Sequence, residues 1–524
     1  MKRDSARLKG NAFDVLVFGG GVYGAWVAYD AALRGLSVAL IEQGDWAAAT
    51  SSASSKLVHG GLRYLETFDF KVVKKSLAER QMLLEAAPHR VWPLRFGVPV
   101  YADSRVGSLR LKAGLTLYDM LAGSAGGAMA HRHFGKDAFA ERFPILDTSG
   151  LKGGYTYADA QTDDARLVLE LIDGAIANGA VCVNYCRMDT VQEEDGRAVA
   201  AVLEDVLTGE IFAVRARQFV NATGYWMARA ADVKCRLTKG VHLVLPGCGL
   251  HEALLLTAKS DGRVFFVIPW YGRTLVGTTD TDYRGDLARV TVDPDDVAYL
   301  LAAVNGYLEK AWTANDVIGS FAGLRALKYS DVAAPSAASR GWKLEIAPNG
   351  VHYSIGGKLT SAREDAVSIV DSLCARMGVA RATATQGRPF PWKPERSSVG
   401  ASSGGTVAGM QSRAVQLGLD EESAVWLVRR HGRRAKDVLD IVEADPHMGR
   451  RIVEDLAITY ADLLYCAREE MAVHLSDLLR HRTPLLILAR LGEPELRKIA
   501  GIVAPALGWD AAAVEREITD CANG

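Results

Sequence analysis

The sequence predicts an α/β protein (α+β overall) with a parallel-sheet unit near its N-terminus, a β-rich middle and an α-helical C-terminal domain. Three patterns support this prediction. Residues 13–43 read as strand, glycine turn, helix and strand. Residues 180–280 contain short apolar strands, with a hairpin turn expected at Thr208-Gly209, and residues 411–520 are helical and charged. A chain of 524 residues is long enough for two or three domains.

The glycine turn is the most informative feature of the first pattern. A buried-strand pattern at 14–18 leads into a G-x-G-x-x-G run formed by Gly19, Gly21 and Gly24. Glycines allow a tight turn and a close approach of the backbone to a pyrophosphate, and the following helix start presents free N–H groups. Glu42 lies 18 residues after Gly24, where a carboxylate can accept hydrogen bonds from ribose hydroxyls. This context predicts a Rossmann-like dinucleotide-binding unit rather than a purely structural glycine turn.

Composition narrows the class of protein. The formal net charge is −1, so no overall positive field points to nucleic acid, and we expect no such partner. The seven cysteines are scattered without a C-x-x-C pair, which argues against disulfides and a metal site and favours the cytoplasm. No stretch approaches the roughly 20 apolar residues that span a bilayer. Peripheral attachment to the inner face of the membrane stays open, and a homodimer is the default expectation.

Later segments indicate that the nucleotide-binding unit is discontinuous. A strand at 352–355 ends in Gly356 and Gly357, and a helix follows. In large flavin folds late segments return to cover the ring system, so this layout favours FAD over NAD. The expected domains are an FAD-binding domain (1–80, 150–235 and 345–385), a substrate-binding or cap domain (81–149 and 236–344) and a helical C-terminal domain (395–524).

Several blocks of sequence carry a more specific signature. The strongest runs from Ala49 to Glu66 and reads A-T-S-S-A-S-S-K-L-V-H-G-G-L-R-Y-L-E. Further blocks are 151–155, 163–167, 220–224, 277–280, 322–325, 356–360 and 468–483. Together they closely resemble the FAD-dependent glycerol-3-phosphate dehydrogenase/oxidase family over nearly the whole chain. The resemblance implies non-covalent FAD, which takes a hydride at flavin N5 as the C2 hydroxyl of sn-glycerol 3-phosphate is oxidised to dihydroxyacetone phosphate. Electrons then pass to a membrane quinone or, in the oxidases, to oxygen.

The resemblance also indicates which residues act on a phosphorylated substrate. Guanidinium groups bind two phosphate oxygens at once, and lysine acts as a point charge. The positions that match the substrate pocket are Arg63, Tyr64, Arg325, Arg340 and Lys358. His242 is the candidate acceptor of the hydroxyl proton, because the pKa of imidazole lies near neutral pH. Alternatively, Arg325 or Lys358 stabilises a developing alkoxide at the hydroxyl.

The residues expected to hold FAD come from four segments. Glycines and an acid would bind the pyrophosphate and ribose, while the serine-rich loop and the late glycine turn would face the ring. A helix start beside the ring favours the negative charge of reduced flavin. The set is Gly19, Gly21, Gly24, Glu42, Thr50, Ser51, Ser52, Ser55, Lys56, His59, Ala222, Thr223, Gly224, Gly357, Lys358, Leu359 and Thr360.

Four residues depart from the family pattern. Tyr23 replaces a usual Asn, Trp26 a small residue, and Tyr225 and Ala326 each replace a usual Pro. Tyr23 and Trp26 are bulky and are expected to reshape the surroundings of the ring, while Ala326 loosens the backbone that aims Arg325. These departures leave FAD in place but keep the substrate open.

Four alternatives follow from these departures and from the charge pattern. The first alternative is oxidation of sn-glycerol 3-phosphate or of another phosphorylated polyol, such as an erythritol phosphate. The second alternative is an FAD enzyme that oxidises an amine or amino acid. A non-enzymatic binding module and a pyridine-nucleotide dehydrogenase are disfavoured.

In the C-terminal region, the arginine pairs 429–430, 433–434 and 450–451 are expected to form a solvated helix face rather than a surface for anionic lipid headgroups.

Overall fold

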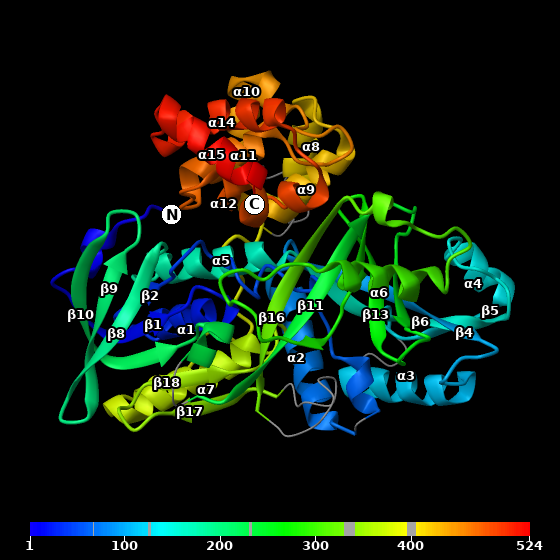
Figure 1. Cartoon of the computed structure of the whole chain (residues 1–524), viewed down its shortest axis with the longest axis horizontal. Coiled ribbons are helices and arrows are strands. Elements are labelled where there is room, and N and C mark those ends of the chain that lie inside the picture. Colours follow the sequence, from blue (N-terminus) through cyan, green and yellow to red (C-terminus); the bar gives the residue numbers. More distant parts are fainter. Residues whose placement is uncertain (67, 124–126, 230–232, 330–340, 396–404, 524) are drawn as a thin grey trace.

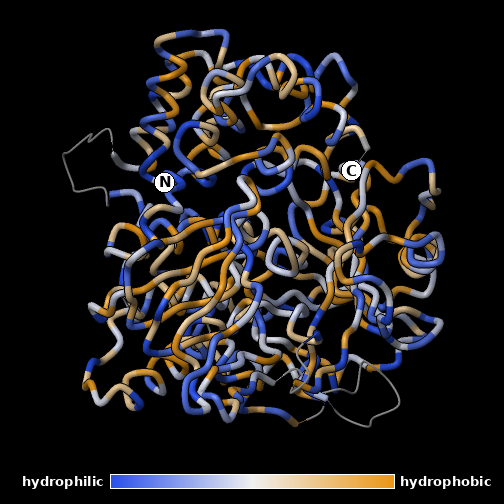
Figure 2. Tube along the Cα trace, turned by 60° about the vertical axis from the view of Figure 1, so that its left-hand side comes forward, coloured by the Kyte–Doolittle hydropathy of each residue, from blue (hydrophilic) through white to orange (hydrophobic). Residues whose placement is uncertain are grey.

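The computed structural model describes residues 1–66, 68–123, 127–229, 233–329, 341–395 and 405–523. Two β-sheets lie beside each other, and the C-terminal helices form a separate layer above them (Figure 1). Apolar segments gather in the inner strands and helices, while polar segments are more frequent at the periphery (Figure 2). The predicted combination of an α/β unit, a second β-rich layer and a helical C-terminal region is confirmed.

The first sheet is built around a central parallel strand. Its strands in spatial order are β17 (Lys343–Ile346), β18 (His352–Ile355), β10 (Glu210–Asn221), β1 (Ala12–Phe18), β2 (Val38–Ile41) and β7 (Val181–Val183), with β8 (Cys186–Glu194) and β9 (Arg197–Asp205) joined to β10. β1 pairs in parallel with both β2 and β10. Its residues Val15, Leu16 and Val17 are fully buried, as expected for a parallel strand covered on both faces. The hairpin predicted at Thr208-Gly209 connects β9 to β10.

Three helices pack beside one another on this sheet. They are α1 (Val22–Leu33), α5 (Asp164–Ala177) and α7 (Ala362–Met377). α1 begins at the glycine turn, and Gly21 is its N-cap. Asp163 caps α5 by accepting a hydrogen bond from the backbone N–H of Arg166. Residues far apart in the sequence therefore form one nucleotide-binding unit.

The second sheet adjoins the carboxyl ends of the first sheet's strands. Its main path runs β15 (Thr281–Asp282), β11 (Cys235–Leu245), β14 (Arg273–Gly277), β13 (Val264–Trp270), β12 (Ala253–Thr257), β4 (Val91–Tyr101), β6 (Leu151–Thr162) and β3 (Leu57–Val58), with β16 (Gly319–Lys328) on β11 and β5 (Arg132–Gly135) on β6. Around it lie α2 (Phe70–Ala86), α3 (Ser108–Ala122), α4 (Lys136–Arg142) and α6 (Pro294–Asn305).

The expected domain boundaries stay predictions. Residues 151–162, at the start of the second expected FAD-binding segment, form β6, which pairs with β4 in the second sheet along its length.

The C-terminal helices are α8 (Val407–Gln416), α9 (Glu421–His431), α10 (Ala435–Ala444), α11 (Tyr460–Glu469), α12 (Leu475–Asp477), α13 (Leu485–Leu488), α14 (Glu493–Leu507) and α15 (Ala511–Asn523). No described helix is both long enough and apolar enough to cross a lipid bilayer.

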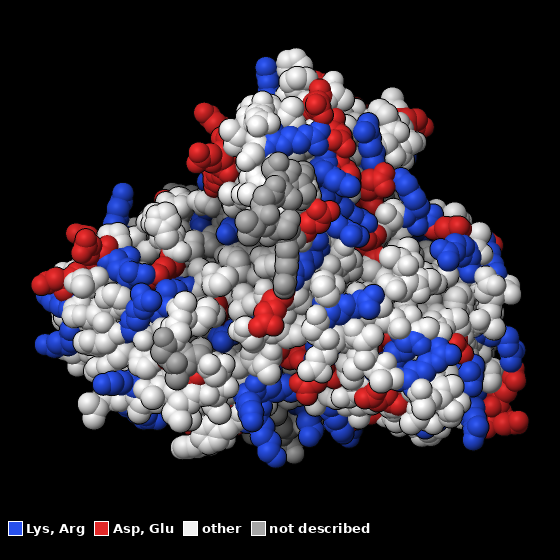
Figure 3. All heavy atoms as spheres, turned by 180° about the vertical axis from the view of Figure 1, so that it is seen from behind, with Lys and Arg blue, Asp and Glu red and all other residues white. Residues whose placement is uncertain are grey.

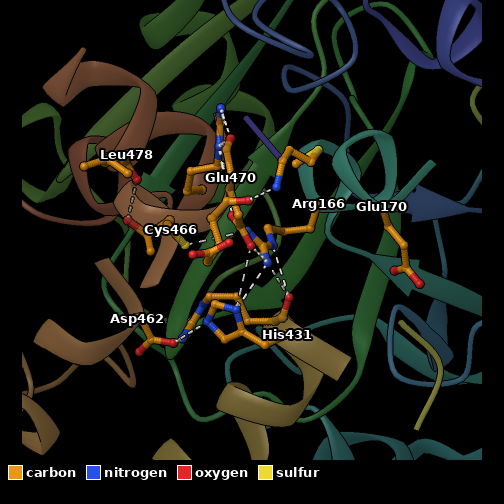
Figure 4. Close-up of polar contacts among 12 residues, drawn as sticks. Arg166, Glu170, His431, Asp462, Cys466, Glu470 and Leu478 are labelled. Carbon is orange, nitrogen blue, oxygen red and sulfur yellow. Dashed lines mark hydrogen bonds and ion pairs between the residues drawn. The ribbon is translucent and has the colours of Figure 1, made fainter. Parts of the chain in front are cut away.

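A buried ionic cluster joins these helices to α5. The guanidinium of Arg166 pairs with Glu470, with Nη2 donating to Oε1 at 2.8 Å (Figure 4). Asp462 accepts a hydrogen bond from Arg430 Nη1 at 2.6 Å and lies 2.8 Å from His431 Nε2. Burial alone would raise the pKa of Glu470, but Arg166 holds it well below its usual value. Both charges are therefore present in the interior and depend on each other.

Four of the six arginines in the pairs of this region are engaged within the protein, so the expected solvated face is wrong for them, while Arg433 and Arg450 are exposed. Arg430 is fully buried, Arg434 pairs with Asp173 at 2.6 Å, and Arg451 pairs with Asp420 at 2.7 Å. Arg429 stacks on the ring of Trp92, 4.5 Å from its centroid. These four side chains serve packing and ion pairing rather than a headgroup-binding surface.

Replacing Glu470 with Gln removes the charge facing Arg166 and keeps the size of the side chain. Breaking a buried ion pair costs about 3–5 kcal/mol, because the remaining charge stays in the interior. We expect the free energy of unfolding, measured by chemical denaturation, to fall by about that amount. Arg497→Ala, which removes the exposed partner of Glu493, is the control and should leave stability nearly unchanged. Equal effects in the two variants would contradict the importance of the buried pair.

Candidate functional site

A cavity of about 750 Å³ lies between the two sheets. Its wall includes the carboxyl ends of β1, β2 and β10 on one side and strands β6, β11, β13 and β16 on the other. In open α/β sheets, ligands bind at this edge of the strands. The volume falls within the range of cofactor and small-ligand pockets, about 300–1,000 Å³.

The glycine turn forms one end of this cavity. Gly19 has φ +103°, and a Cβ there would lie 2.6 Å from the carbonyl oxygen of Ala222, so the two turns touch directly. Gly21 lines the cavity, and the N–H of Val22 donates to Ser51 Oγ at 2.9 Å. Gly24 instead packs against the backbone of Gly19, where a Cβ would clash. Gly24 thus shapes the turn rather than facing a ligand.

Glu42 stands at the end of β2, on the cavity wall. Its carboxylate accepts hydrogen bonds from the N–H of Gly20 at 2.7 Å and of Gly44 at 3.0 Å. Burial raises the pKa of Glu42, although these N–H groups act in the opposite direction. The predicted ribose acceptor therefore also fixes the glycine turn.

The turn after β10 faces the same end. Thr223 donates from both its N–H and its hydroxyl to Asn221 Oδ1, and the segment from Ala222 to Gly224 lines the cavity. Tyr225 and Trp226 follow, with ring centroids 5.6 Å apart. The wall is completed there by Arg187, Met188 and Arg229. No sequence motif pointed to Arg187 and Met188, because only the pairing of β8 with β9 brings β8 to this place.

The serine-rich loop is used in two ways. Thr50, Ser51 and Ser55 line the cavity. Lys56, expected near the flavin ring, points into the interior, where Nζ pairs with Asp164 at 2.7 Å. A buried ammonium needs a counter-charge, which explains this placement. Ser52 lies off the cavity wall and donates to Ala49 of its own turn.

Three cationic side chains line the cavity, from the segment 62–65, β16 and the turn at 356–360. They are Arg63, Arg325 and Lys358. Lys358 Nζ lies 3.8 Å above the ring of Tyr64, and the guanidinium of Arg63 lies 5.1 Å from the same ring. The ring of Tyr64 thus contacts two of these three cations. Arg340 lies outside the described residues.

Arg325 is aimed by the segment between β14 and β15. Its Nη2 donates to Thr278 Oγ1 at 3.0 Å, and its Nη1 lies 3.3 Å from the buried carboxylate of Asp280. The G-T-T-D block contained both residues, but the sequence assigned neither a role. Ala326 also lines the cavity.

His242 projects from β11 to the cavity wall. Its Nε2 lies 2.8 Å from Ser55 Oγ, and its ring stacks on Phe321 with centroids 4.9 Å apart. Burial, followed by the charges of Arg325 and Lys56, lowers the pKa of His242 well below its usual value. The near-neutral pKa expected from the sequence is therefore wrong, and the imidazole is uncharged at neutral pH.

His59 and the late glycine turn close the cavity. The N–H of His59 donates to Thr360 Oγ1 at 3.2 Å, and its ring contacts Phe266 edge-on. The turn residues Gly357, Lys358, Leu359 and Thr360 line the wall. The N–H of Lys358 is not directed at a ligand, because it donates to the hydroxyl of Tyr23 at 3.1 Å.

Of the two bulky departures in α1, one faces the site. Tyr23 lines the cavity. Trp26 is buried against Phe390, with ring centroids 5.5 Å apart, on the side of the helix that packs in the core. The expectation that Trp26 reshapes the surroundings of the ring is wrong, because residues three apart on a helix need not share the face that meets a ligand.

The chain matches two family models. One is described as FAD dependent oxidoreductase and covers residues 14–363; the other is the C-terminal domain of alpha-glycerophosphate oxidase and covers residues 397–514. The glycine cradle, the start of α1 and the acid ending β2 all border the cavity, so the site fits a dinucleotide such as FAD.

Relatives extend over nearly the whole length. Glycerol-3-phosphate dehydrogenase of Synechocystis is 34% identical, over 98% of this chain and 97% of that protein. Aerobic glycerol-3-phosphate dehydrogenase of Bacillus subtilis is 35% identical, over 90% of this chain and 87% of that protein. The solved glycerol-3-phosphate dehydrogenase from Bacillus halodurans complexed with FAD has a TM-score of 0.77 at 28% identity, over 98% of this chain and 95% of that one. The chain therefore belongs to the FAD-dependent glycerol-3-phosphate dehydrogenase family of oxidoreductases.

Proposed function

We propose that the protein oxidises the C2 hydroxyl of sn-glycerol 3-phosphate to dihydroxyacetone phosphate. FAD accepts the hydride at N5, and the electrons pass on to a quinone or another acceptor. The observation that carries this proposal is that Arg63, Arg325 and Lys358 all line the same cavity. A phosphate dianion is the ligand whose charge and oxygen atoms match such a set.

The surrounding residues suit the two other requirements of the reaction, which are a group that accepts the hydroxyl proton and a fixed orientation of the substrate. His242 is uncharged and lies beside Ser55, so its imidazole is in the form that accepts the hydroxyl proton. The proximity of Arg325 lowers the basicity of His242 in the free protein. An anionic substrate that neutralises Arg325 raises that basicity once it is bound. Thr278 and Asp280 restrict the guanidinium and thereby orient the substrate.

Two other substrate classes remain as alternatives to sn-glycerol 3-phosphate. Tyr225 and Ala326 both line the cavity and both replace a usual Pro, so another phosphorylated polyol such as an erythritol phosphate stays an alternative. The fold is also shared with glycine oxidase from Geobacillus kaustophilus, at a TM-score of 0.53 and 19% identity. Three cations exceed what a single amino-acid carboxylate requires, so the charge of the pocket favours a phosphate.

Anaerobic addition of sn-glycerol 3-phosphate to the purified yellow protein should bleach the oxidised-flavin absorption band. Arg325→Lys keeps the charge but loses the two-pronged guanidinium, so the substrate concentration for half-maximal bleaching rate should rise about tenfold. The visible spectrum of the variant should still show bound flavin. Bleaching by an amino acid but not by any polyol phosphate would overturn the proposal, and bleaching only by a longer polyol phosphate would redirect it.

The pH dependence of flavin reduction tests the role of His242. Because its folded pKa is lowered, His242 stays deprotonated as the pH falls toward about 6.5, the usual histidine value. The rate of flavin reduction at low substrate concentration, which reports on the free protein, should therefore hold steady from pH 8 to about 6.5 and decline only below it. His242→Gln should slow reduction about 10²–10⁴-fold.

His352→Gln provides the matched control for this test. His352 is another buried histidine, but it lies in β18 and contacts Ser372 rather than the cavity. It should leave the rate of flavin reduction near that of the unaltered protein. If His242→Gln also reduces flavin within a few-fold of that rate, the proton is handled by another group.

We propose in addition that the protein lies on a membrane surface through α3 and the segment before α2. Leu109 and Met120 of α3 are 87% and 66% exposed, and Phe68 is 77% exposed. Arg110 and Lys112 are exposed on the same helix. Apolar side chains with neighbouring cations suit the interface of an anionic membrane. In Figure 3, Lys and Arg side chains are visible near the middle of the lower edge, opposite the C-terminal helices, and both signs of charge occur toward the right-hand end of that edge.

The location of α3 fits a lipid-soluble electron acceptor. The short helix Leu62–Leu65, which carries Arg63 and Tyr64, packs against α3 and α2. The substrate end of the cavity thus lies close to the proposed membrane-facing surface. This geometry favours a quinone over an acceptor that approaches from the C-terminal helices.

Co-sedimentation with vesicles tests this surface. The protein should bind vesicles of phosphatidylcholine with phosphatidylglycerol, and the double substitution Leu109→Asp and Met120→Asp should weaken binding at least about tenfold. Ile211→Asp is the control, because Ile211 is 68% exposed on β10 in the other sheet. Flavin bleaching should be unchanged in all variants. Equal vesicle binding by the double variant and the unaltered protein would exclude this surface.

A further inference from the structure

Tyr23 connects the first helix to the late glycine turn. It lies in the first turn of α1, directly after the glycine run. Its hydroxyl accepts a hydrogen bond from the N–H of Lys358 at 3.1 Å and donates to Asp365 Oδ2 at 2.7 Å. The turn at 356–360 and the start of α7 are thereby joined to α1 through a single oxygen atom.

The fit of this hydroxyl to the turn is close. Gly357 has φ +94°, and a Cβ at this position would collide with the Tyr23 oxygen. Only glycine therefore permits the contact and the backbone conformation together. The peptide that presents Lys358 to the cavity is thus held from behind by Tyr23.

Asp365 extends the connection to a third helix. It is buried, and its Oδ1 accepts a hydrogen bond from Lys75 of α2 at 2.7 Å. Its Oδ2 also accepts one from Ser361 at 3.1 Å. Burial and the carboxylate of Asp365 raise the pKa of Tyr23, so the phenol keeps its proton and remains the donor. Asp365 thus ties α1, α2 and α7 together beneath the turn.

We infer that Tyr23 is a positioning residue, which acts through Asp365 to fix the late glycine turn and the aim of Lys358 toward the flavin. The inference builds on the proposed placement of the flavin ring at this turn. It assigns a role to a residue that departs from the family pattern. A positive side chain and N–H groups held near the ring stabilise the negative charge of reduced flavin. A loosened turn should therefore weaken FAD binding and lower the reduction potential of the bound flavin.

Tyr23→Phe removes only the hydroxyl and retains the ring. It removes the acceptor of the Lys358 N–H and the donor to Asp365, and the dissociation constant of FAD should rise roughly 5- to 100-fold. Titration of the apoprotein with FAD, followed by flavin fluorescence, measures this change. The midpoint potential, measured at saturating FAD, should become more negative.

Tyr29→Phe is the matched control. Tyr29 lies on the same helix and is buried, but it packs against Trp26 in the core rather than lining the cavity. It should leave the FAD dissociation constant and the potential unchanged even if it alters thermal stability. Equal changes in the two variants, or unchanged affinity and potential in Tyr23→Phe, would overturn the inference.

A double-mutant cycle with Asp365→Asn tests whether Tyr23 acts on FAD binding through Asp365. If Tyr23 acts through Asp365, the two substitutions together should weaken FAD binding by less than the product of their separate effects. A multiplicative result would show that the two residues act independently and would contradict the inference. None of these measurements uses a substrate, so they stay informative whichever alcohol the enzyme oxidises.

Discussion

The parallel pairing of β1 with both β2 and β10 is the constraint on which the rest of the structure depends. It brings three strand ends to one edge, and each end contributes a different part of the site. Gly19 and the turn at Ala222 touch so closely that a single Cβ would separate them. Glu42 then anchors the glycine turn from the neighbouring strand. A dinucleotide site therefore exists only when residues more than 200 positions apart are paired in register.

Charge is distributed differently in the site and in the interior. Interior charges are matched by partners, as in the pairs of Arg166 with Glu470 and Arg482 with Asp45. At the cavity wall, Arg63 and Lys358 lie over the ring of Tyr64, while Arg325 is held by Thr278 and Asp280. An anionic ligand in the cavity would be attracted by all three cations, so the site can gain binding free energy from charges that line one cavity.

The helical C-terminal region also supports the cofactor end of the site. Arg482 binds Asp45 through two hydrogen bonds of 2.6 and 2.8 Å, and Asp45 belongs to the loop that follows Glu42. Burial alone would raise the pKa of Asp45, but Arg482 and His481 hold it low. The loop that leads from the end of β2 into the serine-rich segment is therefore anchored by a domain that does not itself line the cavity.

The sequence by itself determined the elements whose signals are local. The glycine turn, the acid after β2, the late Gly356-Gly357 turn and the hairpin before β10 are backbone features, and glycine, helix starts and strand alternation encode them within a few residues. The family signature added the cofactor and the cationic pocket. Only the tertiary structure decided where side chains point. It directed Lys56 to Asp164 and Trp26 into the core, lowered the pKa of His242, and joined Tyr23 to Lys358 and Asp365. These outcomes depend on packing and on charges contributed by distant elements, which no local pattern contains.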